Sequence, residues 1–149
     1  MSENSTVHAT AVLIGARAAL IRGPAGAGKS RLALALLAAA ERGALPFARL
    51  ISDDRTFLDA RSGMLLARPP ADLAGLLEVR GLGIRRLPYE SVAAIGLVVD
   101  LGEPAAARLP QELEVTLAGV RLPWLAVPPQ ADALALLLAS LRTERHLTA

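Results

Sequence analysis

The segment 23–30, Gly-Pro-Ala-Gly-Ala-Gly-Lys-Ser, has the spacing G-x-x-x-x-G-K-[ST] of a phosphate-binding loop. Its glycines allow consecutive backbone N–H groups to point at an anion, and the helix that follows directs the positive end of its dipole at the same phosphates. We expect the Lys29 ammonium to contact the β- and γ-phosphates of a nucleotide and the Ser30 hydroxyl to bind Mg²⁺. The predicted nucleotide-binding residues are Gly23, Pro24, Ala25, Gly26, Ala27, Gly28, Lys29 and Ser30.

Phosphoryl transfer also needs carboxylates, one to accept the proton of the attacking hydroxyl and one to support the metal. Asp53 and Asp54 follow the segment 48–52, and Asp100 ends the apolar segment 95–100. Two adjacent aspartates in a turn after a strand can divide these tasks, and the sequence leaves open which of them is the acid/base. The alternative for this pair is a turn or a helix cap. Asp100 has the position of the metal-site aspartate of ordinary P-loop enzymes, but we favour a structural role for it at the end of its strand.

The phosphate loop requires a strand before it and a helix after it, and the sequence predicts both. Alternating apolar residues predict two strands, 8–15 and 18–22, that form a hairpin before the loop. The Ala- and Leu-rich segment 30–42 has no internal Gly or Pro and predicts a helix that ends at Gly43. Further strands are predicted at 48–52, 56–58, 64–67, 95–101 and 112–117.

Two later segments complete the predicted fold. The segment 76–86 contains two glycines that predict an irregular backbone, and the segment 130–145 predicts a second long helix. The apolar face of that helix consists of Ala133, Leu134, Leu137, Leu138 and Leu141. The predicted fold class is therefore α/β: a P-loop sheet with a mixed strand order, one helix after the loop and a C-terminal helix.

The composition limits the classes of protein to which the chain can belong. Its 149 residues, 53% hydrophobic and 20% charged, are enough for one domain, and we predict a loose tail at 1–7 and a single domain at 8–149. The chain has no cysteine and no secretory segment near Met1, so we expect a cytoplasmic protein. Short apolar segments, and a formal charge of only +2 with arginines interspersed among acids, argue against a membrane or a nucleic acid as partner.

From His8 to about Arg142 the chain resembles the catalytic domain of bacterial HPr kinase/phosphorylase. The resemblance depends on four elements in order: His8, the phosphate loop, Arg-Leu-Ile-Ser-Asp-Asp-Arg at 49–55, and Leu-Glu-Val-Arg-Gly-Leu-Gly-Ile at 77–84. The last element is highly specific to that family. It comprises Leu77, Glu78, Val79, Arg80, Gly81, Leu82, Gly83 and Ile84.

This resemblance implies a kinase that transfers phosphate from ATP, with Mg²⁺, to a regulatory serine of the phosphocarrier protein HPr. It implies that Ser30 and Glu78 hold Mg²⁺ and that the Asp53/Asp54 pair contains the acid/base. Arg108 matches a catalytic arginine that stabilises the transferring phosphoryl group. The catalytic residues implied in this way are His8, Lys29, Asp53, Asp54 and Arg108. The family also implies a homo-oligomer, typically a hexamer.

The chain departs from the family pattern at three places. The core begins almost at the first residue, as in a short form that lacks the N-terminal domain of the family. Arg31 stands where the family usually has Glu, and Val-Pro-Pro-Gln-Ala-Asp-Ala at 127–133 has lost both arginines of the loop associated with dephosphorylation. Because phosphorolysis needs cationic groups to hold phosphate, we predict a kinase with weak or absent phosphorylase activity.

Two other functions are compatible with the sequence. One is a nucleotide-binding regulatory module that has kept the phosphate loop and lost catalysis. The other is a small-molecule P-loop kinase with Asp100 at its metal.

Overall fold

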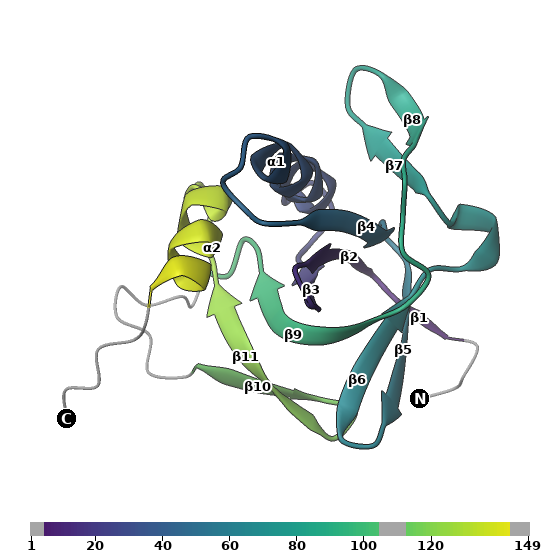
Figure 1. The fold of residues 1–149 in the computed structure, drawn as a ribbon. Helices are drawn as coiled ribbons and strands as arrows, with labels where there is room; N and C mark the ends of the chain where they lie inside the picture. The colour runs from purple at the N-terminus through teal and green to yellow at the C-terminus, as the bar shows by residue number, and fades with distance from the viewer. Residues whose placement is uncertain (1–4, 105–112, 144–149) are drawn as a thin grey trace.

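The computed structural model describes residues 5–104 and 113–143 (Figure 1). Within them, nine strands form one sheet: β1 (Thr6–Val7), β2 (Ala9–Ile14), β3 (Arg17–Arg22), β4 (Ala48–Ser52), β5 (Thr56–Arg61), β6 (Met64–Arg68), β9 (Ala93–Asp100), β10 (Glu114–Leu117) and β11 (Val120–Ala126). A separate hairpin consists of β7 (Leu76–Val79) and β8 (Gly83–Arg86). The helices are α1 (Lys29–Glu41), the short 3-10 helix η1 (Ala71–Leu73) and α2 (Ala133–Arg142).

The large sheet is mixed and has the order β1-β5-β6-β9-β3-β2-β4. Strand β9 pairs in parallel with β3 and with β11, whereas the β2–β3 and β5–β6 pairs are antiparallel hairpins. The first part of β9 also pairs with β6. One long strand therefore joins the part of the sheet beside the phosphate loop to the β5–β6 hairpin.

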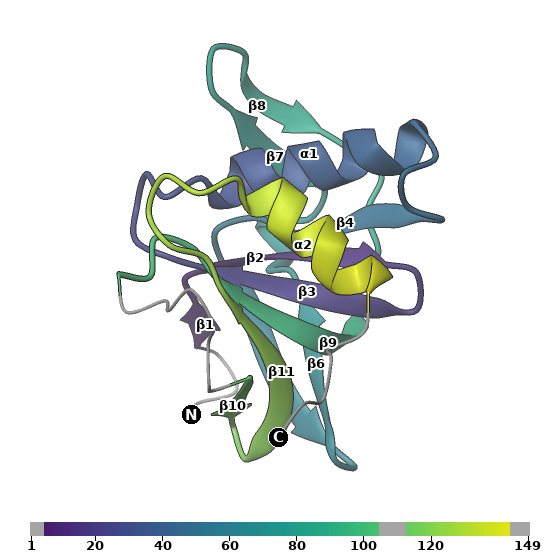
Figure 2. The same cartoon turned by 90° about the vertical axis from the view of Figure 1, so that its left-hand side faces the viewer.

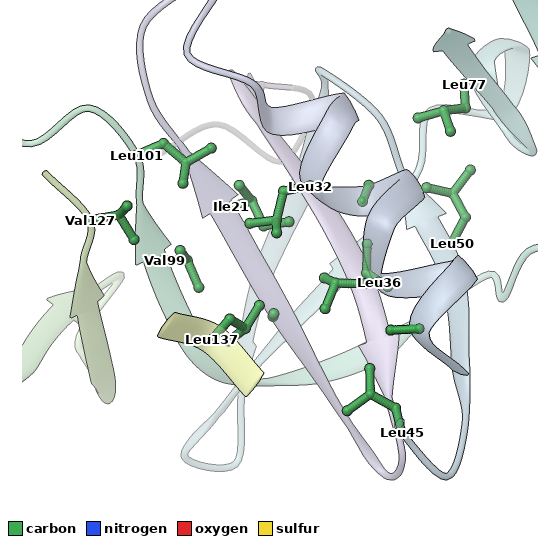
Figure 3. Packing of buried hydrophobic residues seen from close by; sticks show 14 residues of the cluster. Ile21, Leu32, Leu36, Leu45, Leu50, Leu77, Val99, Leu101, Val127 and Leu137 are labelled. Atoms are coloured by element: carbon green, nitrogen blue, oxygen red, sulfur yellow. The ribbon is translucent and has the colours of Figure 1, made fainter. Parts of the chain in front are cut away.

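Aliphatic side chains on the two faces of this sheet form two cores. Because side chains alternate along a strand, Leu20 and Ile21 point to opposite faces. Ile21 packs with Leu36 of α1 and Leu137 of α2 in the first core (Figure 3). Both helices cover this face of the sheet (Figure 2). Leu20 lies in the second core with Leu65, and these cores fix the ends of β2, β3 and β4, from which the site is built.

The predicted α/β class, mixed sheet and two helices are confirmed. The second helix is shorter than predicted because Asp132 caps it: its Oδ1 accepts a hydrogen bond of 3.0 Å from the N–H of Ala135. Gln130, expected inside the helix, has a left-handed φ of 66°. Leu141 is 43% exposed, so the buried apolar face does not reach it.

Three segments differ from the sequence-based expectation. Residues 76–86 form the regular hairpin β7–β8, with positive φ angles at Gly81 and Gly83 in and after its turn. Thr6 and Val7, expected in a loose tail, pair with β5. Strand β11 was not predicted, because Pro123 within it indicates a break. Among the described residues, no helix has the length and apolar character needed to cross a membrane.

Candidate functional site

A cavity of about 710 Å³ lies between the phosphate loop, the turn after β4 and the β7–β8 hairpin. It is large enough for a nucleotide-sized ligand. The predicted catalytic and metal-binding residues that line it are His8, Lys29, Ser30, Asp53, Asp54 and Glu78. The fold therefore brings together residues from four separate segments of the chain.

The backbone of the phosphate loop has the conformation of an anion cradle. Gly23, Gly26 and Gly28 have φ angles of 157°, 83° and 101°, and Gly28 is the N-cap of α1. A Cβ atom at Gly23 would lie 3.0 Å from the carbonyl oxygen of Leu101, so only glycine fits there. This shape leaves room for phosphate oxygens against the backbone, which fits the predicted nucleotide.

Lys29 contacts the backbone at the start of the phosphate loop. Its side chain is buried, and its Nζ donates hydrogen bonds to the carbonyl oxygens of Gly23 at 2.8 Å and Pro24 at 3.3 Å. In the described part of the chain, no carboxylate forms an ion pair with this ammonium. Its charge is therefore available to a bound phosphate.

Asp53 connects three elements around the cavity. Its Oδ1 accepts hydrogen bonds from the hydroxyls of Ser30, at 2.6 Å, and Thr10, at 2.9 Å. Its Oδ2 accepts one from the N–H of Glu78, at 3.3 Å. The Ser30 hydroxyl and the Asp53 carboxylate thus supply oxygen atoms beside the cradle, and Glu78 lines the same cavity. Such oxygen ligands are the ones that Mg²⁺ prefers.

No set of three or more His, Cys, Asp or Glu residues in the described segments is arranged to hold a metal by itself. Mg²⁺ is commonly held by one or two protein oxygens together with phosphates and water. The residues beside the cradle therefore fit a Mg²⁺ that arrives with its nucleotide.

Asp54 differs from its neighbour in conformation and partners. It has a left-handed φ of 70°, and its Oδ1 lies 2.5 Å from Nε2 of His8. The two side chains are 58% and 54% exposed and line the cavity. Asp54 therefore presents an accessible carboxylate toward the cavity, whereas the oxygens of Asp53 are occupied by donors.

A set of buried hydroxyls, which sequence reasoning missed, holds this turn. The buried polar side chains of the described chain are Thr10, Lys29, Ser52 and Thr56. The Thr56 hydroxyl donates to the carbonyl oxygen of Ala9 at 2.9 Å and lies 2.5 Å from the hydroxyl of Ser52. The sequence did contain an indication of these hydroxyls, since Ser52 and Thr56 flank the two aspartates and Thr10 lies in an otherwise apolar strand.

Asp100 does not line the cavity. Its carboxylate accepts hydrogen bonds from Arg22, Nε at 2.8 Å and Nη2 at 2.7 Å, and from the indole N–H of Trp124 at 2.7 Å. The carboxylate therefore joins β3, β9 and β11, which is the structural role favoured for it. This arrangement weakens the alternative in which Asp100 supports a metal.

Arg108, the predicted catalytic arginine, lies outside the described residues. Among the described residues, the lysine and arginine side chains that line the cavity are Lys29, Arg31 and Arg80. Arg80 belongs to the turn of the β7–β8 hairpin, beside Glu78. The family-specific segment 77–84 thus contributes both a carboxylate and a guanidinium to the site.

A second cavity, of about 390 Å³, lies on the other side of the phosphate loop. The segment 127–131 lines it together with Leu101 and Gly102. Ala25 and Gly26 of the loop line both cavities. The segment that resembles the dephosphorylation loop therefore adjoins the phosphate loop, and no charged side chain among the described residues lines this cavity.

Comparisons with known proteins agree with this arrangement. The solved structure of the HPr(Ser) kinase/phosphatase from Coxiella burnetii matches with a TM-score of 0.76 and 25% identity, over 93% of this chain and 95% of that one. HPr kinase/phosphorylase from Clostridium beijerinckii is 37% identical over 84 residues, 56% of this chain and 26% of the relative. The Streptococcus thermophilus enzyme is 40% identical over 85 residues, 56% of this chain and 25% of the relative.

The chain thus spans about a quarter of the length of these curated relatives. The family model described as "HPr Serine kinase C-terminal domain" matches residues 1–128, which include the phosphate loop, both aspartates of the turn and the segment 77–84. With the loop, the turn and the hairpin converging on one cavity, the chain belongs to the HPr serine kinase C-terminal domain family.

Proposed function

We propose that the chain is an ATP- and Mg²⁺-dependent kinase that phosphorylates the phosphocarrier protein HPr on a serine. Membership of the family supports a kinase, and the names of the relatives support HPr as the acceptor. The observation that carries the proposal is the convergence of Lys29, Ser30 and the His8–Asp54 pair on a single cavity. A cytoplasmic location and a homo-oligomer, typically a hexamer in the family, stay predictions.

In the proposed mechanism the phosphate loop and Lys29 bind and orient the triphosphate. Ser30 and Glu78 would hold Mg²⁺, which neutralises phosphate charge when it is bound. The serine oxygen forms a bond to the γ-phosphorus while the bond from that phosphorus to the β–γ bridging oxygen breaks, and ADP leaves. The serine proton passes to a carboxylate of the turn after β4.

We assign that proton to Asp54. Its carboxylate is accessible from the cavity, and His8 is its only polar side-chain contact within the described part of the chain, so the serine hydroxyl can approach it. Asp53 accepts three hydrogen bonds and is better placed to hold Ser30 toward the nucleotide. His8, which lies against Asp54 in the lining of the same cavity, orients the accepting carboxylate.

The test is phosphate transfer from ³²P-labelled ATP to HPr in the presence of Mg²⁺. We expect label on HPr that disappears when the acceptor serine is replaced by alanine. Asp54→Asn should lower kcat by about 100-fold or more, the usual contribution of a general base, with ADP affinity nearly unchanged. Asp53→Asn should also weaken binding of Mg²⁺-nucleotide. Binding of ATP without label on HPr under any condition would indicate the nucleotide-binding module instead.

A further inference from the structure

We propose that the second cavity holds the nucleoside of the bound nucleotide and accepts either purine base with little discrimination. This inference rests on the proposed function, since it concerns the other end of the same ligand. The cavity volume of about 390 Å³ lies within the range of small-molecule sites. It adjoins the phosphate loop directly, because Ala25 and Gly26 line both cavities.

The orientation of the nucleotide follows from the positions of the two cavities. A γ-phosphate that is to be transferred must face the proton acceptor, and His8 and Asp54 line only the large cavity. The serine of the acceptor must enter that cavity as well. The nucleoside is at the opposite end of the phosphate chain, and the second cavity opens on the opposite side of the loop.

The lining of the second cavity suits a neutral ring. Leu101, Val127 and Pro128 supply apolar surface, and no charged side chain of the described residues lines it. Among the lining residues in the described segments, Gln130 alone has a polar side chain, and it lies in the turn before α2 with a left-handed φ of 66°. An amide carries both donors and an acceptor, so it can pair with the edge of adenine or of guanine.

The expected result is weak base selectivity. A site rejects the wrong base strongly when that base leaves buried polar groups of the site unpaired. The Gln130 side chain is exposed, so leaving its amide unpaired costs little. We therefore expect the kcat/KM values for ATP and GTP to agree within about tenfold, and Gln130→Ala to lower both by similar factors.

A calorimetric experiment separates the two cavities by using inorganic tripolyphosphate, ADP and GDP as probes. Ala131→Trp, at the edge of the second cavity, should weaken ADP and GDP binding at least tenfold and leave tripolyphosphate binding unchanged. Ala60→Trp, an exposed alanine on β5, is the matched control and should change none of them. Unchanged ADP and GDP binding in the Ala131→Trp variant, or a loss of tripolyphosphate binding with it, would overturn the inference. Failure of the wild-type chain to bind any of the three probes would instead reject the proposed function.

A second, independent observation concerns the backbone of the catalytic turn, and we infer from it that Thr10 is a positioning residue. Its hydroxyl donates to Oδ1 of Asp53 at 2.9 Å and accepts from the N–H of Asp54 at 3.1 Å. The carbonyl oxygen of Asp54 is held by the N–H of Ala9 at 3.1 Å. Thr10 is fully buried, so water does not replace these hydrogen bonds.

One hydroxyl thus fixes the side chain of Asp53 and the backbone of Asp54 together. A non-glycine residue at φ 70° is uncommon and persists only when its surroundings hold it. Without the Thr10 hydroxyl, the Asp54 N–H loses its buried partner and the turn can relax toward an ordinary conformation. The two carboxylates would then lose their separate directions, toward Ser30 and toward His8.

The test compares Thr10→Val, which removes the hydroxyl at similar volume, with Thr10→Ser, which keeps it. Thr10→Val should lower kcat about tenfold or more with little change in the KM for ATP, and Thr10→Ser should recover most of the rate. Thr116→Val, at an exposed position on β10, is the control. The hydrogen-exchange rate of the Asp54 amide, which needs no kinase activity, should rise in Thr10→Val alone. An unchanged exchange rate, or a loss of kcat explained by unfolded protein, would overturn the inference.

Discussion

At the scale of single residues, Lys29 is the position at which the chemistry is most restricted. It is the only lysine among the 16 Lys and Arg residues of a chain that otherwise uses arginine. Its Nζ lies 2.8 Å from the carbonyl oxygen of Gly23, inside a turn with no room for a Cβ atom at that glycine. A compact ammonium fits between the loop and a phosphate, whereas a planar guanidinium has a different shape and spreads its charge.

We therefore predict that Lys29→Arg lowers phosphate transfer to HPr by about 100-fold or more although the charge is kept. Transfer rate and nucleotide affinity are the measurements, with thermal unfolding as a check on folding. Arg121→Lys, the reverse exchange at a residue whose side chain is 75% exposed, should leave the rate unchanged. Full activity of Lys29→Arg would contradict the role assigned to this ammonium.

At the scale of elements, the sequence was most informative where local chemistry decides the structure. The helix after the phosphate loop was predicted to within a residue at each end, because the glycines before it and Gly43 after it are local signals. Strand β11 was missed because its register is set by pairing with β9, a long-range contact that outweighs Pro123. The regular hairpin at 76–86 was missed for a similar reason, since its two glycines with positive φ shape the turn and the start of β8 without interrupting the pairing.

In the site, too, features with a local sequence signal were predicted and features that depend on long-range contacts were not. Spacing in the sequence identified the loop, and the family resemblance identified Glu78 and His8, all of which line one cavity. The hydroxyl network of Thr10, Ser52 and Thr56 could not be predicted, because a buried hydroxyl has meaning only through the partners that the folded chain brings to it.

Asp100 provides a prediction at this scale, because it ties three strands together. With its side chain only 16% exposed, removing it leaves Arg22 and the Trp124 indole without their acceptor. We expect Asp100→Ala to reduce the free energy of unfolding by about 2 kcal/mol and to leave kcat of the folded protein nearly unchanged. Urea unfolding and transfer assays measure the two effects.

Glu114→Ala is the matched control for Asp100→Ala. It breaks the Arg121 ion pair of 2.6 Å at side chains that are 75% and 56% exposed, where such pairs contribute about 0–1 kcal/mol. A folded, stable Asp100→Ala protein without transfer activity would contradict the structural role of Asp100 and favour the alternative in which Asp100 supports the metal.

At the scale of the whole molecule, the two cavities on either side of the phosphate loop differ in charge. Lys29, Arg31 and Arg80 line the large cavity together with the carboxylates of Asp53, Asp54 and Glu78, whereas no charged side chain in the described residues lines the second one. A forward kinase needs cations around the triphosphate and the acceptor, and Lys29, Arg31 and Arg80 can supply them in the large cavity. The reverse reaction must in addition hold a free phosphate that attacks a phosphoserine, and cations supply that binding.

The distribution of charge therefore predicts an enzyme that catalyses the forward transfer much faster than the reverse reaction. The segment 127–133 adjoins the phosphate loop as expected for a dephosphorylation loop, but it consists of valine, prolines, alanines, one glutamine and one aspartate where phosphate binding requires arginine. We expect pyrophosphate release from phosphoserine-HPr and phosphate to be at least about tenfold slower than the forward transfer. A wild-type rate of pyrophosphate release close to the forward rate would show that the cations of the large cavity suffice for both directions.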